Sequence, residues 1–508
     1  MMRKIFRLSI LFMLCLTMLL GTACRQNPES NNSSYLSTGY VDNPNYDADD
    51  TDSSTQDEST DASDATDVSS DKDNNNSDNN TNENNSSNNT NNNDNTNNST
   101  GKDTTVLDLK GRTITYVAYW EELKKGSSQR ANIYWERKEA IEKKYNCKIV
   151  HKFMSRDAID TEVIPSILSG EPIADFFYVT ADRAYSLINK KMVYPLSDLK
   201  QFDFTEEKWN KITLEAATVN GKVYGLDSNN EPYINGALLY NKDYFEKNNL
   251  PDLNELQKAG NFDWDKFREI AKTATKGNVK GFALNASHEN TIPVFIKANG
   301  GKLVTRTGDF TFDSSVTSKN VVNSLKFWQD MCVVDKSVLA TGGTSYLAYQ
   351  DKFTNGEVAM YFAETYQWAN IIKNANFEVG LALFPAGPDS SLPYGISGSA
   401  SFCVMPSTVK NPEEVALVLD SFNGADKQPW EDYYYDIFYD DDIMDTLKLG
   451  LAAVNKKQYV LDYVDCVGDT YYIGLHGAYN KVGNGEMTPA QAVETLAGAL
   501  AATLDSFE

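Results

Sequence analysis

A continuous apolar run, "IADFFYVT" at residues 173–180, lies in a stretch where strand-like and helix-like patterns alternate. Such runs are typical of strands that are buried on both faces of a parallel sheet. Strands are also predicted over residues 112–120 and 147–153, with a helix over 131–146 between them. Alternation of this kind predicts an α/β body with parallel sheets.

Helix starts in the C-terminal half support the same fold class. "NPEEVALVLDSF" has Asn411 as N-cap followed by Pro412, and "TPAQAVETLAGAL" repeats this pattern from Thr488. A capping residue followed by Pro is a common start of a helix. In the strand "CKIVHKF", Ile149, His151 and Phe153 share one face, so His151 is expected to be a core residue rather than a ligand.

The segment before the folded body has a composition that cannot form a core. Residues 24–105 are mostly Asn, Asp, Ser and Thr, and we expect them to be a disordered tether. As a random coil the tether would reach on the order of 50 Å. Much of the formal net charge of -24 lies there. A nucleic-acid partner is not expected, because binding phosphates needs a basic surface.

The N-terminus carries an export pattern. "MMRKIFR" is basic, "LSILFMLCLTMLL" is apolar, and "LGTAC" resembles a bacterial lipobox. We therefore expect residues 1–23 to be a lipoprotein signal peptide and Cys24 to carry the lipid. The expected location is the outer face of the cell membrane, an arrangement usual in Gram-positive bacteria. An ordinary secretory signal with an incidental Cys, or an uncleaved anchor, are the alternatives.

The remaining cysteines and the histidines do not form metal or redox motifs. Cys147, Cys332, Cys403 and Cys466 are far apart, and free thiols are favoured over disulfides. The three histidines show no metal-ligand spacing, and no phosphate-binding glycine loop is present. The sequence thus predicts no metal, no cofactor and no motif-bearing catalytic group. Glycosidase carboxylates leave no local signature, so an enzyme stays open at this point.

Several stretches follow one another in a familiar order. These are "SGEPIADFFYVT", "LINKKMVYPLSDL", "NGKVYGLD", "GALLYNKDYFEKNNL", "ANGGKL", "FTNGEVAMYFAETYQW" and "FPAGP". Their order and spacing resemble the family-1 extracellular solute-binding proteins of ABC importers, which include the maltodextrin-binding protein. The resemblance covers the chain from about residue 110 to its C-terminus.

The resemblance implies a type II periplasmic-binding-protein-like fold. Two interleaved α/β lobes would be joined by crossover strands at a hinge and would close on a solute in the cleft. By the same likeness, residues 106–235 with about 398–430 form lobe 1, and 236–397 with about 431–508 form lobe 2. The implied function is capture of a carbohydrate-like solute and its delivery to the permease subunits of an importer. A monomer is expected.

Candidate ligand residues lie after predicted strands, where open α/β folds place their ligands. Each candidate has a plainer alternative. Trp120 and Trp368 could pack, Asp182 could cap a helix, Glu364 could face solvent, and Ser397 could be hinge structure. In the family the segment after residue 363 supplies a cleft aromatic, and Tyr366 is the residue that falls there. The full set is Tyr119, Trp120, Asp182, Asn229, Asn230, Glu364, Tyr366, Trp368 and Ser397.

Two other functions remain at this point. A secreted glycosidase could use a pair of carboxylates, for example Glu364 with Asp182. A surface protein could instead bind a polysaccharide without any transport. Turnover of an oligosaccharide would distinguish the first, and unchanged uptake in a deletion strain would distinguish the second.

Overall fold

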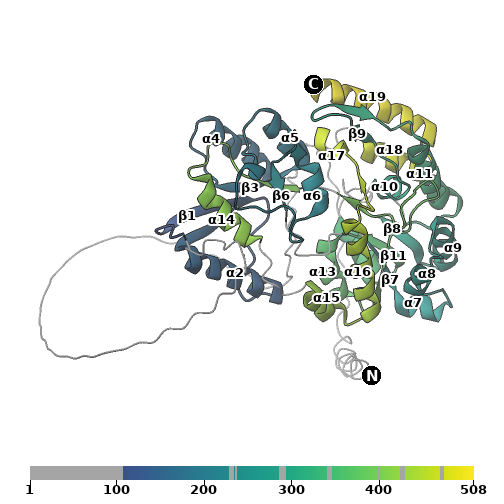
Figure 1. The fold of residues 1–508 in the computed structure, drawn as a ribbon. Helices are drawn as coiled ribbons and strands as arrows, with labels where there is room; N and C mark the ends of the chain where they lie inside the picture. Colours follow the sequence, from purple (N-terminus) through teal and green to yellow (C-terminus); the bar gives the residue numbers. More distant parts are fainter. Residues whose placement is uncertain are drawn as a thin grey trace, which may run out of the picture. The chain divides into compact units, whose positions relative to one another are not determined.

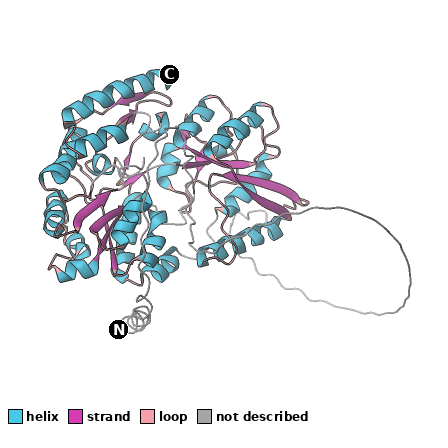
Figure 2. Cartoon of the chain, turned by 180° about the vertical axis from the view of Figure 1, so that it is seen from behind, coloured by secondary structure: helices cyan, strands magenta, loops and turns pink. Residues whose placement is uncertain are grey.

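The computed structural model describes residues 107–227, 234, 237–284, 293–339, 346–398, 401–423, 430–468 and 474–507. Two main sheets organise these residues, and each is surrounded by helices (Figure 1, Figure 2). We call the elements around the five-stranded sheet the first lobe and those around the four-stranded sheet the second lobe.

The first-lobe sheet has the strand order β2-β1-β3-β14-β6. β1 pairs in parallel with β2 and β3, whereas β14 is antiparallel to both of its neighbours. The expectation of parallel sheets is therefore wrong at β14, the one strand of this sheet that enters from a distant part of the chain. The five strands are β1 (Arg112–Ala118), β2 (Cys147–Phe153), β3 (Phe176–Thr180), β6 (Gly225–Leu226) and β14 (Ser401–Val404).

Helices cover both faces of this sheet. Figure 1 shows α4 and α5 on one side of β1 and β3, and α2 and α14 on the other. The first lobe also contains several shorter elements. Besides the five strands, its elements are α2 (Gln129–Tyr145), α3 (Arg156–Ala158), η1 (Ile159–Val163), α4 (Ile164–Leu168), α5 (Ala181–Asn189), η2 (Leu196–Asp198), α6 (Lys211–Ala216), β4 (Thr218–Val219), β5 (Lys222–Val223) and α14 (Pro412–Phe422).

The second-lobe sheet has the order β12-β7-β11-β8, in which β7 alone is antiparallel to its neighbours. Here too the expectation of a parallel sheet is wrong at one strand, β7, which is the first to enter this lobe. The strands of the second lobe are β7 (Ala237–Asn241), β8 (Lys280–Leu284), β11 (Val358–Ala363), β12 (Val379–Leu383) and a separate hairpin of β9 (Val304–Arg306) and β10 (Phe312–Ser314).

The helices of the second lobe come from both halves of the chain. Residues after 430 return to this lobe, where α16 packs on β12 and α19 packs on α11. The helices are α7 (Lys242–Lys247), α8 (Leu253–Lys258), α9 (Trp264–Ala274), α10 (Val294–Ala298), α11 (Lys319–Gln329), η3 (Asp330–Val334), α12 (Tyr346–Thr354), η4 (Thr365–Gln367), α13 (Trp368–Asn374), α15 (Trp430–Phe438), α16 (Asp441–Asn455), α17 (Val464–Val467), α18 (Leu475–Gly483) and α19 (Pro489–Phe507).

A third pairing lies on the path between the two sheets. β13 (Ser397–Gly398), just before β14, pairs in parallel with β15 (Val460–Leu461). The backbone N–H of Val460 also donates to the carbonyl of Ile396 at 3.0 Å. The chain segments that run between the sheets are therefore hydrogen-bonded to each other.

Local sequence explains several element boundaries. At the start of α19 the backbone N–H of Thr488 donates to Gln491 Oε1 at 2.9 Å, and the N–H of Gln491 donates to Thr488 Oγ1 at 3.3 Å. This reciprocal arrangement is a capping box, which confirms the predicted start. Asn411 precedes α14 at a φ of 50°, a left-handed conformation that Asn tolerates, although its side chain makes no capping bond. Gly356, at φ 75°, lies in the turn before β11, a conformation that glycine adopts without strain.

Strand β2 has the predicted bounds, but its face is only partly covered. Ile149 is buried, His151 is half-buried and stacks on Tyr116 with ring centroids 4.8 Å apart, and Phe153 is 42% exposed. The expectation of a shared core face is wrong at Phe153, which lies at the last position of this edge strand. His151 packs in the sheet, as expected.

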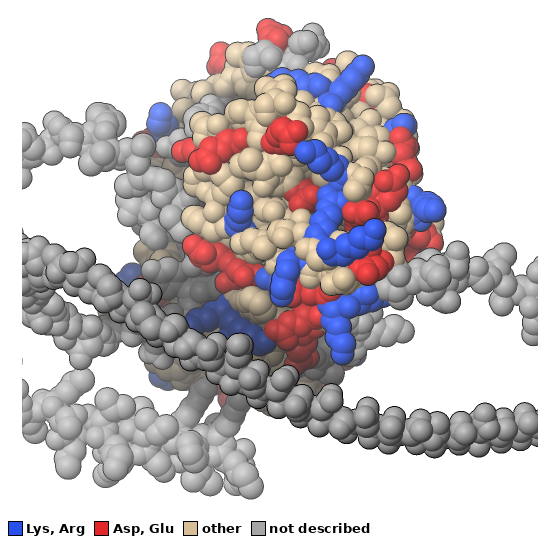
Figure 3. Space-filling model, turned by 90° about the vertical axis from the view of Figure 1, so that its left-hand side faces the viewer, with Lys and Arg blue, Asp and Glu red and all other residues tan. Residues whose placement is uncertain are grey.

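The four described cysteines are free thiols, as favoured from the sequence. Cys147, Cys403 and Cys466 are buried, and burial raises the pKa of the Cys403 thiol well above its usual value. A buried neutral thiol behaves as a small apolar group. On the face of the described first lobe seen in Figure 3, acidic and basic side chains are interspersed. Ion pairs of the first lobe include Arg112–Glu414 and Lys148–Glu142.

Candidate functional site

The carboxyl ends of three first-lobe strands meet at one edge of the sheet. β1 and β3 are parallel, and β6 runs in the same direction because β14 is antiparallel to both β3 and β6. Tyr119 and Trp120 follow β1, Thr180 ends β3, and Asp227 follows β6. The sheet thus brings rings, a hydroxyl and a carboxylate to the same edge.

Tyr119 and Trp120 lie in the bend after β1, and their rings meet edge to face with centroids 5.0 Å apart. The Trp120 ring is half-buried and meets Tyr178 edge to face, with centroids 4.8 Å apart. The Tyr119 ring lies under the guanidinium of Arg156, 5.0 Å from its centroid. Both rings stay partly exposed, so each has surface available for a contact outside the protein.

A tyrosine and an aspartate extend this constellation across the sheet. The hydroxyl of Tyr178 donates to Asp227 Oδ1 at 3.0 Å, and the backbone N–H of Asn210 donates to the Asp227 carbonyl at 3.0 Å. Burial, and then the Asp227 carboxylate, hold the pKa of Tyr178 well above its usual value, so its hydroxyl stays protonated and donates. Trp120, Tyr178 and Asp227 therefore form one contiguous group.

Asp182 lies in the first turn of α5. Its carboxylate accepts a hydrogen bond from the hydroxyl of Thr180 at 2.5 Å and lies 3.7 Å from the guanidinium of Arg183. The N-cap residue of α5 is Thr180 rather than Asp182, so the helix-cap alternative does not describe this carboxylate. Asp182 is half-buried, at the same sheet edge as Trp120.

In the second lobe the corresponding strand end is closed. Glu364 follows β11 and is 5% exposed, and its backbone N–H donates to Gln367 Oε1 at 2.9 Å. The Glu364 carboxylate accepts from the backbone N–H of Gln367, which completes a capping box at η4. Glu364 is thus neither solvent-facing nor free to move, and it caps the next turn.

Trp368 begins α13 in the core of the second lobe. Its ring is fully buried, its indole N–H donates to the Ala363 carbonyl at 3.1 Å, and it packs on Tyr434 and Phe438 with centroids 5.9 and 6.2 Å away. This placement corrects the expectation of a ligand contact and matches the packing alternative. Trp368 is the first residue of α13 and not part of a loop, and its ring packs into the core of the second lobe.

The other candidates have different outcomes. Ser397 is 2% exposed and pairs with Val460 in the β13–β15 crossover, which corresponds to the hinge alternative and corrects the ligand expectation. Tyr366 lies within η4, and its side chain is outside the described part of the structure, as are Asn229, Asn230 and Cys24.

Sequence reasoning missed Tyr178 and Asp227. Tyr178 sits inside the apolar run "DFFYVT", where it read as a core ring, and Asp227 ends "KVYGLD". Two signals could have found them. A polar aromatic in a buried strand needs a partner for its hydroxyl, and an acid directly after a short strand lies at the sheet edge. Only the tertiary pairing of β3, β14 and β6 joins the two.

The chemistry of this edge is that of a binding surface. Ring faces and carboxylates can hold hydroxylated ligands, since rings cover apolar faces and carboxylates accept from hydroxyls. Among the described residues, no group of three or more His, Cys, Asp and Glu side chains is arranged to hold a metal ion. Within the same described ranges, no helix is both long and apolar enough to cross a membrane.

Residues 136–427, more than half of the chain, match the family model of the bacterial extracellular solute-binding proteins. The chain belongs to this family. Its two α/β lobes are those of the type II periplasmic-binding-protein fold, which confirms the predicted fold class. Curated protein sequences include no match to this solute-binding protein.

Solved structures of other solute-binding proteins share the fold. The GacH receptor of Streptomyces glaucescens, solved unliganded and with acarbose, is 16% identical, with a TM-score of 0.58 over 78% of this chain and 100% of that one. UgpB of Mycobacterium tuberculosis, in complex with glycerophosphocholine, is 16% identical, with a TM-score of 0.57 over 77% of this chain and 98% of that one. Lmo0181 of Listeria monocytogenes, in complex with cycloalternan, is 19% identical, with a TM-score of 0.53 over 78% and 98%.

Proposed function

We propose that this solute-binding protein captures a carbohydrate-like solute between its lobes and delivers it unaltered to an ABC importer. The observation that carries the proposal is the group of Trp120, Tyr178 and Asp227 at the carboxyl edge of the first-lobe sheet. A half-buried indole offers an apolar face to a sugar ring, and the carboxylate accepts from its hydroxyls. Family membership and the sugar ligands of GacH and Lmo0181 support the same ligand class.

Asp182 and Tyr119 complete the proposed first-lobe contact surface, and Asn229, Asn230 and Tyr366 stay candidates. We leave out Trp368 and Ser397, which are 0% and 2% exposed. We expect a ligand without multiple negative charges, because Arg183 is already paired with Asp160 and Asp182 and Arg156 covers the Tyr119 ring, while Asp227 adds a further acid. We expect the protein to act as a monomer.

Calorimetry tests the proposal most directly. The purified chain is titrated with a panel of monosaccharides, oligosaccharides and polyols, and at least one is expected to bind with micromolar or tighter affinity. Trp120→Ala should weaken that binding, whereas Tyr435→Ala, which removes a 42% exposed ring on α15, should not. Absence of binding to every member of the panel would count against the carbohydrate proposal.

The glycosidase alternative is not favoured by the structure. One of its two proposed carboxylates, Glu364, is buried and engaged in the capping box of η4. A general acid needs to reach the glycosidic oxygen of a bound substrate. Incubation of the protein with the bound oligosaccharide, followed by mass spectrometry of the solution, checks this point, since any shortened product would overturn the receptor proposal.

We also propose that Cys24 is lipidated and holds the protein on the outer face of the cell membrane, with residues 24–105 as its tether. The basic and apolar N-terminal pattern supports this. Labelled palmitate fed to the producing cells should enter the wild-type protein but not Cys24→Ala, which should be released into the medium. Equal labelling of the two proteins would contradict it. Delivery to the importer is tested by uptake of the bound sugar in a strain that lacks the gene.

A further inference from the structure

Two segments of the second lobe contact first-lobe helices beside the crossover strands. One is the β9–β10 hairpin, residues 304–314, and the other is residues 457–467, which include β15 and α17. We call these two segments together the hinge pad. In the pad, α17 packs directly on α5 of the first lobe, and hydrogen bonds connect the pad to α6 and β4.

Arg306 is the polar centre of the hinge pad. Its Nη1 donates to the Tyr185 hydroxyl at 2.9 Å and to the Thr218 carbonyl at 2.9 Å, both in the first lobe. Its guanidinium also lies 4.8 Å from the ring centroid of Tyr463, in the second lobe. One side chain thus joins a helix, a strand and a ring from both lobes. Arg suits this role because its planar group stacks on a ring while its N–H groups donate sideways.

Aromatic packing surrounds this arginine. Tyr185 is fully buried, and its ring meets Phe312 with centroids 5.8 Å apart and Phe310 at 6.3 Å. Phe312 in turn lies 6.2 Å from Tyr463. These rings belong to the same hydrophobic cluster that fills one face of the first-lobe sheet and the second lobe. The core is therefore continuous from one lobe to the other through the hinge pad.

Further hydrogen bonds fix the edges of the contact. The hydroxyl of Tyr459 donates to Glu215 Oε2 on α6 at 2.7 Å. On the hairpin, Asp309 Oδ1 accepts from the backbone N–H of Asn220 at 2.8 Å. With Arg306 in the middle, the first lobe is held at three separate points.

Asp462 joins the two segments of the pad into one block. It is 1% exposed, and its carboxylate accepts from the backbone N–H groups of Leu303, Val304 and Val464 at 2.8, 3.0 and 3.0 Å. The backbone N–H of Tyr463 donates to the Val304 carbonyl at 3.2 Å. A buried carboxylate with three donors is a fixed connection, because each broken bond would leave a buried charge unsatisfied.

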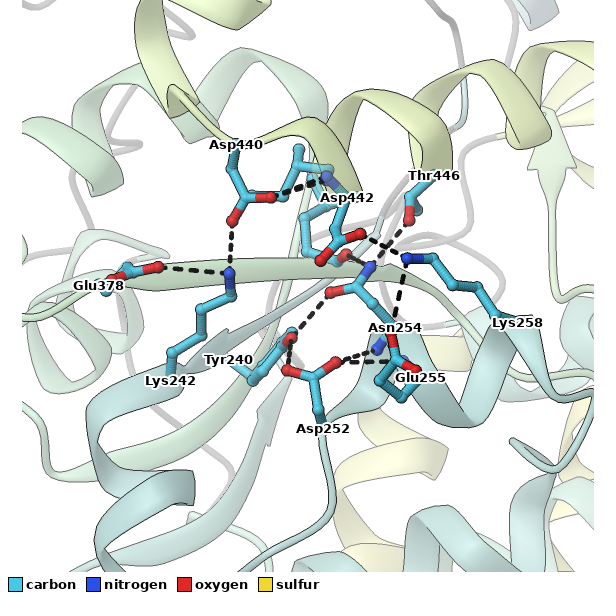
Figure 4. A network of polar contacts seen from close by, with 12 residues as sticks. Tyr240, Lys242, Asp252, Asn254, Glu255, Lys258, Glu378, Asp440, Asp442 and Thr446 are labelled. Atoms are coloured by element: carbon cyan, nitrogen blue, oxygen red, sulfur yellow. Dashed lines mark hydrogen bonds and ion pairs between the residues drawn. The ribbon is translucent and has the colours of Figure 1, made fainter.

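The pad is also fixed to the rest of the second lobe through α16, which leads into residue 457. Figure 4 shows the polar contacts that hold the start of α16 on α7 and α8. Asn254 Nδ2 donates to Thr446 Oγ1 at 2.8 Å, and Lys242 and Lys258 pair with Asp440 and Asp442. The pad therefore moves with the second lobe.

We propose that the hinge pad stays docked on the first lobe when the lobes open and close, and that it is the pivot of that motion, with Arg306 as its positioning residue. Open and closed states of such proteins differ by a few kcal/mol. Parting the pad would break several hydrogen bonds, each of about 1 kcal/mol, and expose four buried or half-buried rings. That sum exceeds the difference between the states, so the lobes turn about the pad and do not separate there.

Distances measured by double electron–electron resonance test the pivot. They are measured in the ligand-free protein, so the outcome does not depend on which solute binds. Nitroxides are attached through keto-bearing amino acids at Ala140 on α2 and Glu246 on α7, which are exposed and lie in different lobes. Native cysteines then stay unlabelled. Arg306→Met and Tyr459→Phe should each broaden the distribution of distances, because the pivot loses a fixed point.

Two control variants lose equivalent bonds inside one lobe. Arg268→Met removes ion pairs with Asp330 and Asp335, and Tyr244→Phe removes a hydrogen bond of 2.7 Å to the Ala274 carbonyl. Both should leave the distance distribution unchanged. Unchanged distributions in the pad variants, or equal broadening in the controls, would overturn the proposal. If Arg306→Met does not fold, Tyr459→Phe decides the test.

Hydrogen exchange tests whether the pad stays docked. The Asn220 amide should exchange slowly in the ligand-free protein, and Asp309→Ala should speed its exchange about tenfold with little effect elsewhere. Exchange of this amide in the wild-type protein as fast as in an unstructured peptide would show that the pad parts, and would overturn the pivot.

Discussion

The carboxyl edges of the two sheets carry the same residue types, a tryptophan and an acid, but these side chains differ in how far they are buried. In the first lobe, Trp120 and Asp182 are half-buried beside an exposed edge. In the second lobe, Trp368 is fully buried and Glu364 is 5% exposed. For the two tryptophans the difference follows from what comes after the strand, since β11 runs at once into η4 and α13, whereas β1 is followed by a loop before α2.

This comparison teaches that a strand end alone does not present a side chain to a ligand. A capping box turns Glu364 back onto its own backbone, and the helix that follows rotates Trp368 into the core. The first-lobe edge has no such closure at Trp120, so its ring is left beside Tyr178 and Asp227.

Trp368→Ala gives the largest expected effect. Removal of a fully buried indole should lower the free energy of unfolding by about 3–5 kcal/mol, because it leaves a large cavity and an unpaired Ala363 carbonyl. Urea unfolding followed by circular dichroism measures it, with Tyr435→Ala as the exposed-ring control, which should change stability by less than about 1 kcal/mol. A small loss of stability with a large loss of ligand affinity would instead place Trp368 in the binding site.

Trp120→Ala should show the reverse pattern. We expect about a tenfold loss of affinity for the bound sugar, because an aromatic face contributes about 0.5–1.5 kcal/mol beyond its buried area. Its cost in unfolding free energy should be clearly smaller than that of Trp368→Ala, since the ring is only half-buried. Calorimetry and urea unfolding on the same preparations compare the two. Equal affinities for wild type and variant would remove Trp120 from the proposed site.

His151 gives the first lobe a pH dependence, and His476 on α18 of the second lobe contributes in the same direction because burial lowers its pKa too. Burial lowers the pKa of His151 to about 4, with opposing effects from the Glu122 carboxylate, which raises it, and the Lys138 ammonium, which lowers it. The unfolded chain, with a pKa near 6.5, binds the proton more readily, so stability is full above pH ~6.5 and falls as the pH drops towards 4. His151→Gln should flatten this part of the curve.

Unfolding midpoints of wild type and His151→Gln at several pH values between 7.5 and 4 measure this effect. Carboxylates also titrate near the lower end, so the difference between the two proteins is the quantity that reports His151. Parallel curves for both proteins would show that His151 protonates equally well in the folded and unfolded states.

The sequence predicted the local elements of the fold well. The bounds of β2 and the capped start of α19 follow from period-two alternation and from the Thr488–Gln491 pair, which are properties of neighbouring residues. The direction of β7 and β14 could not be read, because it depends on pairing between segments far apart in the chain. The two-lobed class came from the order of motifs rather than from any one of them.

The candidate site was predicted less well, and the reason is again tertiary. Trp120 and Asp182 lie at the expected sheet edge, but the bond between Tyr178 and Asp227 exists only once β3 and β6 share a sheet. Conversely, the burial of Glu364 depends on a local interaction, its capping box with Gln367 three residues later. The spacing of a capping box was present in "ETYQ" and would have indicated a closed strand end.

Glu364→Gln gives the smallest expected effect. It distinguishes a structural role of this carboxylate, as a helix cap, from a role in ligand binding. A glutamine keeps an oxygen that accepts from the Gln367 backbone N–H, so the free energy of unfolding should change by no more than about 1 kcal/mol. Because the side chain faces its own helix turn, affinity for the bound sugar should stay within about twofold of wild type. Urea unfolding and calorimetry on this variant, beside Trp120→Ala, therefore compare the closed edge with the open one. A tenfold loss of affinity with unchanged stability would mean that the second-lobe edge opens towards the ligand, and that the capping box is only one of two states of Glu364.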